Sequence, residues 1–339
     1  MQQRHPPIHQ EKHNKTRTMK DCRLKNLLVN FRALFTTNIR KRINENSNKI
    51  AILEDLVVDR EITERYHYFR VIDYYVRHEQ ESLPYKKELD YLRRLGAYCN
   101  FPYQPAPMPT IDTGFDTASN MAYVIHRHKK LFFPAKFSVE EAAAAYSNYI
   151  QEEKILGISD TGDAPHQYQS PSVQVEDGDV VFDIGAAEGL FALDHIEKAS
   201  RAVIVENDPQ WVAALQLTFA PYSEKVTIIQ KGISSTDTEH TLSLKTLLAH
   251  EDYRSAFIKM DIEGYELPSI ASALDFLKEK KGTKLAMAAY HRQHDADELL
   301  ALLNSIGYTT EFSTGYMLFH LYDIPTPPYF RHGVIRAKK

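Results

Sequence analysis

Three carboxylates stand within six residues at Asp261, Glu263 and Glu266, directly after the apolar run 256–260. A later apolar run is followed by His291. Histidine is the usual side chain that accepts a proton from a reacting hydroxyl, and a neighbouring carboxylate can orient its ring or stabilise its charge. We therefore predict that His291 is a general base, with Asp261 and Glu263 beside it in an active site.

Other roles are open for the same residues. His166 is a second candidate for the base. Glu266 stands where a helix should begin, and the helix dipole favours an acid there, so we expect Glu266 to cap that helix. Asp261, Glu263 and His291 also offer oxygen and imidazole ligands for a hard cation. Their spacing lacks a dense ligand pattern, however, and we predict no metal site.

A glycine-rich turn follows an earlier apolar run and has the spacing of a binding loop. Asp183 stands near the end of that run, and Gly185, Ala187 and Gly189 follow it. Such a turn brings backbone N–H groups and the N-terminus of the next helix close to a ligand. Glu206 ends the next apolar run about 20 residues later, where an acid accepts hydrogen bonds from a ribose diol. We predict that these residues bind a ribose-containing cofactor.

The turn favours one class of cofactor. A dinucleotide fingerprint reads G-x-G-x-x-G, because the pyrophosphate needs a close backbone approach. Here Ala187 replaces the middle glycine, and Glu188 adds a negative charge at the mouth of the turn. Both changes suit S-adenosylmethionine (SAM), which carries a sulfonium and an ammonium but no phosphate. We predict SAM, with Asp261 near its sulfonium; a dinucleotide and a turn without a ligand are the alternatives.

The elements that position these residues alternate between strand and helix from Val173 onward. This alternation predicts a parallel sheet with right-handed crossovers. We expect strands at 180–184, 202–206, 226–230, 256–260 and 285–290, and helices near 189–198, 209–219, 242–250, 266–278 and 295–305. A closing pair near 307–312 and 316–321, with Gly315 between its halves, predicts an antiparallel hairpin. The fold class is therefore α/β and Rossmann-like.

The first half of the chain has a different composition. Residues 1–50 hold twelve Lys/Arg and three Asp/Glu, although the net charge of the whole chain is -4. We predict a disordered basic tail at 1–18 and a helical region at 19–137, where an amphipathic basic helix from Leu24 either contacts an anionic surface or packs on its own domain. A capping box predicts a helix at 138–155. The cofactor domain should span 138–325, followed by a tail at 326–339.

The segment from about 138 to 321 resembles the FkbM family of SAM-dependent methyltransferases. The matching pieces are Glu152-Glu153, Pro165-His166-Gln167-Tyr168, Asp183-Ile184-Gly185-Ala186, Phe257 to Glu266, Tyr290-His291 and Gly307-Tyr308. The resemblance implies a class I methyltransferase sheet of five parallel strands plus a C-terminal antiparallel hairpin. It implies SAM contacts for Asp183, Gly185, Gly189 and Glu206, and active-site positions for Asp261, Glu263 and His291. Two departures are the Ala187-Glu188 pair and Tyr265, which stands where a small residue is usual.

The resemblance also implies a reaction, O-methylation of a hydroxyl on a sugar, glycan or related small molecule. The alternatives are a different acceptor, such as RNA served by the basic arm, and a non-catalytic SAM-binding scaffold; nucleic acid is not the expected partner. The two cysteines, Cys22 and Cys99, form no metal or disulfide motif and fit a reducing compartment, so we expect a cytoplasmic protein. No apolar run approaches the length of a membrane-spanning helix.

Overall fold

The computed structural model describes residues 63–103, 108, 110–155, 164–319 and 326–339. The chain divides into two compact units, Met1–His67 and Tyr68–Lys339. In the first unit, the described residues 63–67 are helical. The predicted disordered tail and the amphipathic helix from Leu24 lie outside the described residues. The site discussed below belongs to the second unit.

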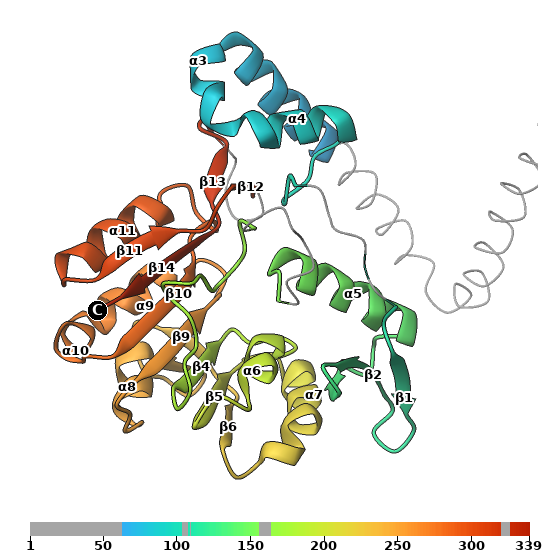
Figure 1. Ribbon diagram of the computed structural model, residues 1–339, viewed down its shortest axis with the longest axis vertical. Coiled ribbons are helices and arrows are strands. Elements are labelled where there is room, and N and C mark those ends of the chain that lie inside the picture. The colour runs from blue at the N-terminus through green and yellow to red at the C-terminus, as the bar shows by residue number, and fades with distance from the viewer. Residues whose placement is uncertain (1–62, 104–107, 109, 156–163, 320–325) are drawn as a thin grey trace, which may run out of the picture. The chain divides into compact units, whose positions relative to one another are not determined.

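A seven-stranded sheet is the centre of the second unit, with the strand order β11-β14-β10-β9-β4-β5-β6 (Figure 1). Five strands of this sheet are parallel: β4 (Val180–Ile184), β5 (Arg201–Val205), β6 (Val226–Ile229), β9 (Ala256–Met260) and β10 (Thr283–Ala288). Their predicted positions are confirmed to within two residues at each end. The predicted Rossmann-like α/β class is therefore confirmed.

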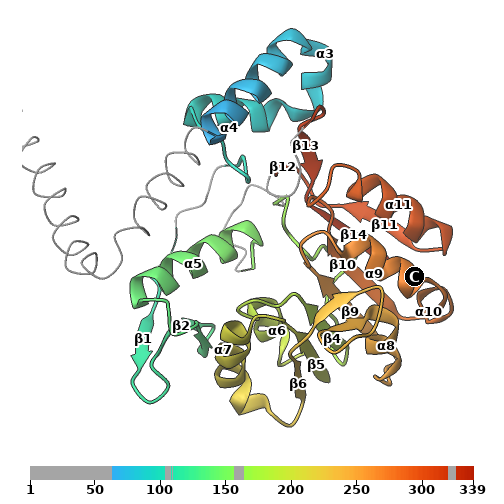
Figure 2. The same ribbon diagram turned by 180° about the vertical axis from the view of Figure 1, so that it is seen from behind.

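Helices cover both faces of this sheet (Figures 1 and 2). On one face, four helices pack apolar side chains against the strands: α8 (Leu244–Ala249), α9 (Glu266–Ser272), α10 (Leu274–Glu279) and α11 (Asp295–Ser305). On the other face the covering helices are α6 (Leu190–His195) and α7 (Pro209–Phe219), and α5 (Val139–Glu152) shares their apolar cluster. The single helix predicted at 266–278 is interrupted at Ala273, which separates α9 from α10.

The antiparallel strands correct the predicted hairpin. β11 (Thr309–Phe312) pairs with β14 (Val334–Lys338), and β12 (Tyr316–Leu318) pairs with β13 (Phe330–His332). β14 also pairs antiparallel with β10, so it lies inside the sheet. The segment 326–339, predicted as a tail, therefore supplies a buried strand. Gly315 indicated a local turn, whereas the real partner of β11 lies more than 20 residues further along the chain.

The region before the sheet domain is also more than helical. An antiparallel meander of β1 (Thr113–Asp116), β2 (Met121–His126) and β3 (Lys129–Phe132) lies within the segment predicted to be helical. Arg127 and His128 both adopt left-handed backbone angles, which gives the tight β2–β3 turn its twist. The predicted capping box is confirmed at the start of α5, where the Ser138 side chain accepts a hydrogen bond from the Glu141 amide.

Several tyrosine rings pack in an apolar cluster of the helices before the meander. Residues 68–77, α3 (Glu79–Ser82), the short η1 (Leu83–Tyr85) and α4 (Lys86–Leu95) precede the meander. Tyr75 is buried, and its ring lies against Phe330 of β13.

A small parallel pair, β7 (Gly232–Ser234) and β8 (Thr241–Ser243), follows β6. Among the described helices, none is long and apolar enough to cross a membrane.

Candidate active site

The turn after β4 and the end of β9 are packed against each other at the carboxyl edge of the sheet. The amide of Asp261 donates a hydrogen bond to the carbonyl of Ile184 at 3.0 Å. Gly185 has a φ of +70°, and a Cβ at this position would overlap the backbone carbonyl of Asp261. Glycine is therefore required here both by the left-handed backbone and by the close approach of two chain segments.

Substituting this glycine should destabilise the fold. We expect Gly185→Ala to lower the free energy of unfolding by about 2–4 kcal/mol, because left-handed strain and overpacking add. Gly178→Ala is the matched control, since Gly178 has a φ of +88° but open space around its Cβ position. Urea denaturation should show a loss of about 1–2 kcal/mol for the control. Equal losses for the two variants would argue against the clash.

A cavity of about 570 Å³ opens at this edge of the sheet, beyond the ends of β4, β5 and β9. Its volume is within the usual range for a site that binds a small molecule or cofactor. The sequence-predicted residues that line it are Gly185, Ala187, Glu206, Asp261 and Glu263. Ligands of open α/β sheets bind at this edge, so the structure gathers most of the predicted site in the expected place.

Glu206 is positioned by two backbone amides. One carboxylate oxygen accepts a hydrogen bond from the Ala187 amide at 2.8 Å, and the other accepts from the Asp208 amide, also at 2.8 Å. The first bond ties the glycine-rich turn to the end of β5. An ionised carboxylate has about four lone-pair sites, so two remain for hydroxyl groups in the cavity. This is the geometry that a ribose diol needs.

Asp183 has a different place from the one predicted. Among the described residues that line the cavity, Asp183 is absent; it is buried beneath the turn. Its Oδ2 accepts a hydrogen bond from the Ala192 amide of α6, and its Oδ1 lies 3.1 Å from Nζ of Lys259. Lys259 Nζ donates to the carbonyl of Gly185 at 2.7 Å. Asp183 thus supports the turn from below, and the cofactor contact predicted for it stays a prediction.

Gly189 also supports the turn from outside the cavity lining that the described residues form. It has a φ of +76°, and its α-carbon faces the side chains of Leu215 and Phe219 on α7.

Burial disfavours the charged form of Lys259, but Asp183 and the neighbouring carboxylates outweigh this and raise the pKa of that ammonium. The ammonium beneath the turn therefore stays charged at neutral pH.

Asp261 accepts several hydrogen bonds at the cavity wall. Its Oδ2 accepts hydrogen bonds from the hydroxyls of Tyr168 at 2.7 Å and Tyr290 at 3.3 Å. The same oxygen lies 3.2 Å from Nε2 of His166, and Oδ1 lies 3.3 Å from Nε2 of His291. Burial favours the neutral acid, but the hydrogen bond from His166 and the charge of His291 hold the pKa of Asp261 well below its usual range.

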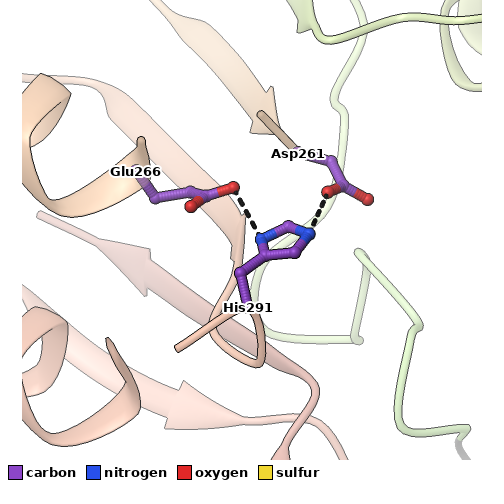
Figure 3. Close-up of side chains that lie close together, drawn as sticks. All are labelled: Asp261, Glu266 and His291. Carbon is purple, nitrogen blue, oxygen red and sulfur yellow. Dashed lines mark ion pairs between the residues drawn. The ribbon is translucent and has the colours of Figure 1, made fainter. Parts of the chain in front are cut away.

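His291 lies between two carboxylates (Figure 3). Its Nδ1 is 3.1 Å from Oε1 of Glu266, and its Nε2 faces Asp261 and, at 3.6 Å, Glu263. Burial alone would lower the pKa of His291, but the hydrogen bond with Glu266 and the nearby charges raise it to about 9. A general base must be neutral to accept a proton. The geometry therefore disfavours the predicted role of His291 as the base.

Glu266 differs from the predicted helix cap in one respect. It occupies the first residue of α9, as expected, and is fully buried. Its Oε1 accepts a hydrogen bond from the Ile262 amide at 2.8 Å and faces the ring of His291. The N-terminal amides of α9 receive no side-chain cap from Tyr265, the residue before the helix. Glu266 is a partner of the histidine that its local sequence context did not reveal.

Asp261, Glu266 and His291 are also the described residues whose ligand atoms gather within 4.8 Å of one another. A metal site would need these atoms to face a common point. Here the imidazole ring lies between the two acids and presents one nitrogen to each (Figure 3). Ion pairs between groups of opposite sign fit this arrangement, and the predicted absence of a metal stays a prediction.

Two tyrosines that contact Asp261 were not predicted as site residues. Tyr168 and Tyr290 come from segments more than 100 residues apart, yet both donate to Asp261. Each is close in sequence to a histidine that was a candidate for the base. Tyr168 follows His166 by two residues, and Tyr290 directly precedes His291. That adjacency was the available signal. Burial raises the pKa of both hydroxyls far above the ordinary value, so they act as hydrogen-bond donors.

Neither a protein-family model nor a curated protein sequence matches this chain. Solved structures with a similar fold include the methyltransferase FkbM from Methylobacillus flagellatus KT, at 24% identity and a TM-score of 0.39. That alignment covers 50% of this chain and 46% of the other, so this chain spans about half of its length.

Two further structures have similar folds. One is SMU.1697c from Streptococcus mutans in complex with SAH, with 13% identity, a TM-score of 0.33, and coverage of 50% of this chain and 92% of that one. The other is an rRNA methylase from Streptococcus thermophilus, with 13% identity, a TM-score of 0.32, and coverage of 49% and 89%. Each alignment covers about half of this chain. The SAH and the rRNA in these descriptions are the ligand and the substrate of the other two proteins.

Proposed function

We propose that this protein is a SAM-dependent O-methyltransferase that acts on a hydroxyl of a sugar, glycan or related small molecule. The proposal rests mainly on the position and hydrogen bonds of Glu206. Its carboxylate lines a cavity of cofactor size at the carboxyl edge of a Rossmann-like sheet. Both of its oxygens are fixed by backbone amides and can still accept from a ribose diol.

The charges of the cavity fit SAM better than a dinucleotide. Among the described lining residues, Glu206, Asp261 and Glu263 are acidic, and Lys231 is basic. An acidic lining suits a ligand with a sulfonium and an ammonium, and it disfavours a pyrophosphate. When bound, SAM supplies an electrophilic methyl group. Trp211 and Ile233 line the same cavity and offer apolar surface for a purine ring.

The residues of this chain can contribute mainly by alignment. Methyl transfer is an in-line displacement, and holding two reactants in the right geometry accounts for much of such a rate enhancement. Asp261 lines the cavity and is held ionised by its donors, so it can accept a hydrogen bond from an acceptor hydroxyl and orient it. The acidic wall favours a neutral acceptor over a phosphorylated one.

The reaction can be tested with SAM carrying a labelled methyl group. We expect transfer of the label to hydroxyls of neutral oligosaccharides or glycosides and none to RNA. RNA as the acceptor is the second candidate, and in that case labelling should fall steeply as salt rises. Label in RNA with that salt dependence would overturn the proposed acceptor class. Tight SAM binding with no transfer to any acceptor would instead favour the scaffold alternative.

A further inference from the structure

We propose that His291 is a positioning residue, which Glu266 holds as an imidazolium and which fixes the carboxylate of Asp261 at the cavity wall. Only the effect on turnover rests on the proposed methyl-transfer function. The protonation state and the orientation of Asp261 are properties of the protein without any ligand. Glu266, His291 and Asp261 are called the charge clamp below.

The protonation state follows from the partners of the ring. Nδ1 of His291 lies 3.1 Å from Oε1 of Glu266, and Nε2 lies 3.3 Å from Oδ1 of Asp261. An ionised carboxylate can only accept, so a ring nitrogen beside it must carry a hydrogen to interact favourably. Both nitrogens are in this position. A neutral imidazole would place one bare lone pair against an acid.

Both acids accept hydrogen bonds. Glu266 is fully buried, and its Oε1 accepts a hydrogen bond from the Ile262 amide at 2.8 Å. Asp261 accepts from the hydroxyls of Tyr168 and Tyr290, both of which donate to the oxygen that does not face His291. These donors stabilise negative charge on each carboxylate. The ring between the two acids is therefore their shared cation.

The clamp fixes how the carboxylate of Asp261 is turned. One oxygen is held by Tyr168, and the other lies against His291. With partners on both oxygens, rotation about the bond to the carboxyl group is restricted. Asp261 lines the cavity, whereas its partner His291 is 1% exposed. His291 therefore acts on a bound acceptor through Asp261.

The other groups around His291 support the charged form. Glu263 and Asp261 face it from the loop after β9, and Glu266 faces it from the start of α9. Tyr290 and the ring of Phe319 lie against its own ring, and Arg331 donates to its backbone carbonyl at 3.0 Å. Asp295 at the start of α11 also interacts electrostatically with it. Asp261, Glu263 and Glu266 thus face the ring itself, whereas Arg331 contacts the backbone of His291.

The clamp has a pH dependence opposite to that of a general base. Burial would lower the pKa of His291, but Glu266 and the other acids raise it to about 9 in the folded protein. The reference pKa of about 6.5 for histidine applies to the unfolded chain. The stability that the charged ring contributes is therefore fully present below about pH 6.5 and is lost as pH rises through about 9. A histidine base would instead give a rate that rises through about 6.5.

The direct test is nitrogen NMR on ¹⁵N-histidine-labelled full-length protein without ligand, from pH 6 to 10. The His291 signals, assigned by their loss in His291→Gln, should show both nitrogens protonated at pH 7.5. In Glu266→Gln the same ring should lose its proton at lower pH. A neutral tautomer of His291 at pH 7.5 would overturn the proposal. This result stands whether or not the protein binds SAM.

The kinetic arm uses turnover under saturating SAM and acceptor. Wild-type turnover should be level from pH 6.5 to 8 and fall as pH rises through about 9. His291→Gln should lower turnover by about 10- to 100-fold, since misplacement of an aligning group has this effect, and its alkaline fall should disappear. His332→Gln, at a histidine stacked on Phe312, is the control and should keep the wild-type profile. A wild-type rate that rises through about pH 6.5 and loses that rise in His291→Gln would restore the base assignment.

Discussion

An Asp261→Asn variant should lose about 100-fold or more in methyl-transfer turnover, because it removes the aligned charge of the cavity wall. Asp261 accepts from two tyrosine hydroxyls and faces two histidine nitrogens. An amide would turn its own N–H₂ group toward some of these donors, so the side chain would rotate or its donors would withdraw. Single-turnover rates at saturating SAM measure this loss separately from cofactor affinity.

Glu263→Gln is the matched control for that variant. Glu263 lines the same cavity and also faces His291, but its side chain is 66% exposed. Solvent screens an exposed charge, so we expect a change of less than about fivefold in turnover. Circular dichroism and the urea midpoint should establish that both variants are folded. A result in which Glu263→Gln is impaired as severely as Asp261→Asn would move the aligning role away from Asp261.

A Glu206→Ala variant should weaken SAM binding at least tenfold. Each hydrogen bond to a charged group is worth about 1.5–3 kcal/mol, and about 1.4 kcal/mol corresponds to a factor of ten in affinity. The substitution also frees the Ala187 amide that Glu206 holds at 2.8 Å, which loosens the glycine-rich turn. Glu206→Gln keeps one acceptor oxygen and should lose less affinity. Titration calorimetry of the three proteins with SAM gives this ranking.

The opposite ranking would be informative. If Glu206→Ala binds SAM as tightly as the wild type while keeping its circular dichroism spectrum, the ribose does not lie at the end of β5. The turn after β4 would then need another partner in the ligand. Equal losses for Glu206→Ala and Glu206→Gln would point to the carboxylate charge as the main contribution, instead of the number of hydrogen bonds.

The local patterns in the sequence predicted much of the fold and of the cofactor side of the site. The strands β4, β5 and β9 are mostly apolar and buried, and each ends near a charged or glycine residue. The capping box at Ser138 and Glu141 lies within one helical turn. Glu206 could be recognised because its role depends on its own strand and on a turn nearby in the chain.

Features that depend on distant partners were not predictable in this way. β14 pairs with β10 and β11 across segments that share no local turn. The sequence predicts His291 as a base, but its partner Glu266 comes from α9, a distant part of the fold, and helps to raise the pKa of His291 to about 9. Asp183 likewise turned out to support the turn through Lys259. In each case the chemical type of the residue was visible, whereas its neighbours depended on the folded chain.

The most direct measurement is a calorimetric titration of the wild-type protein with SAH, the demethylated product of SAM, and separately with NADH. The cavity at the ends of β4 and β5 should bind SAH with one site per chain. NADH should give no saturable heat, because its pyrophosphate would meet the acidic lining of Glu206, Asp261 and Glu263. Saturation by NADH together with no binding of SAH or SAM would contradict the account.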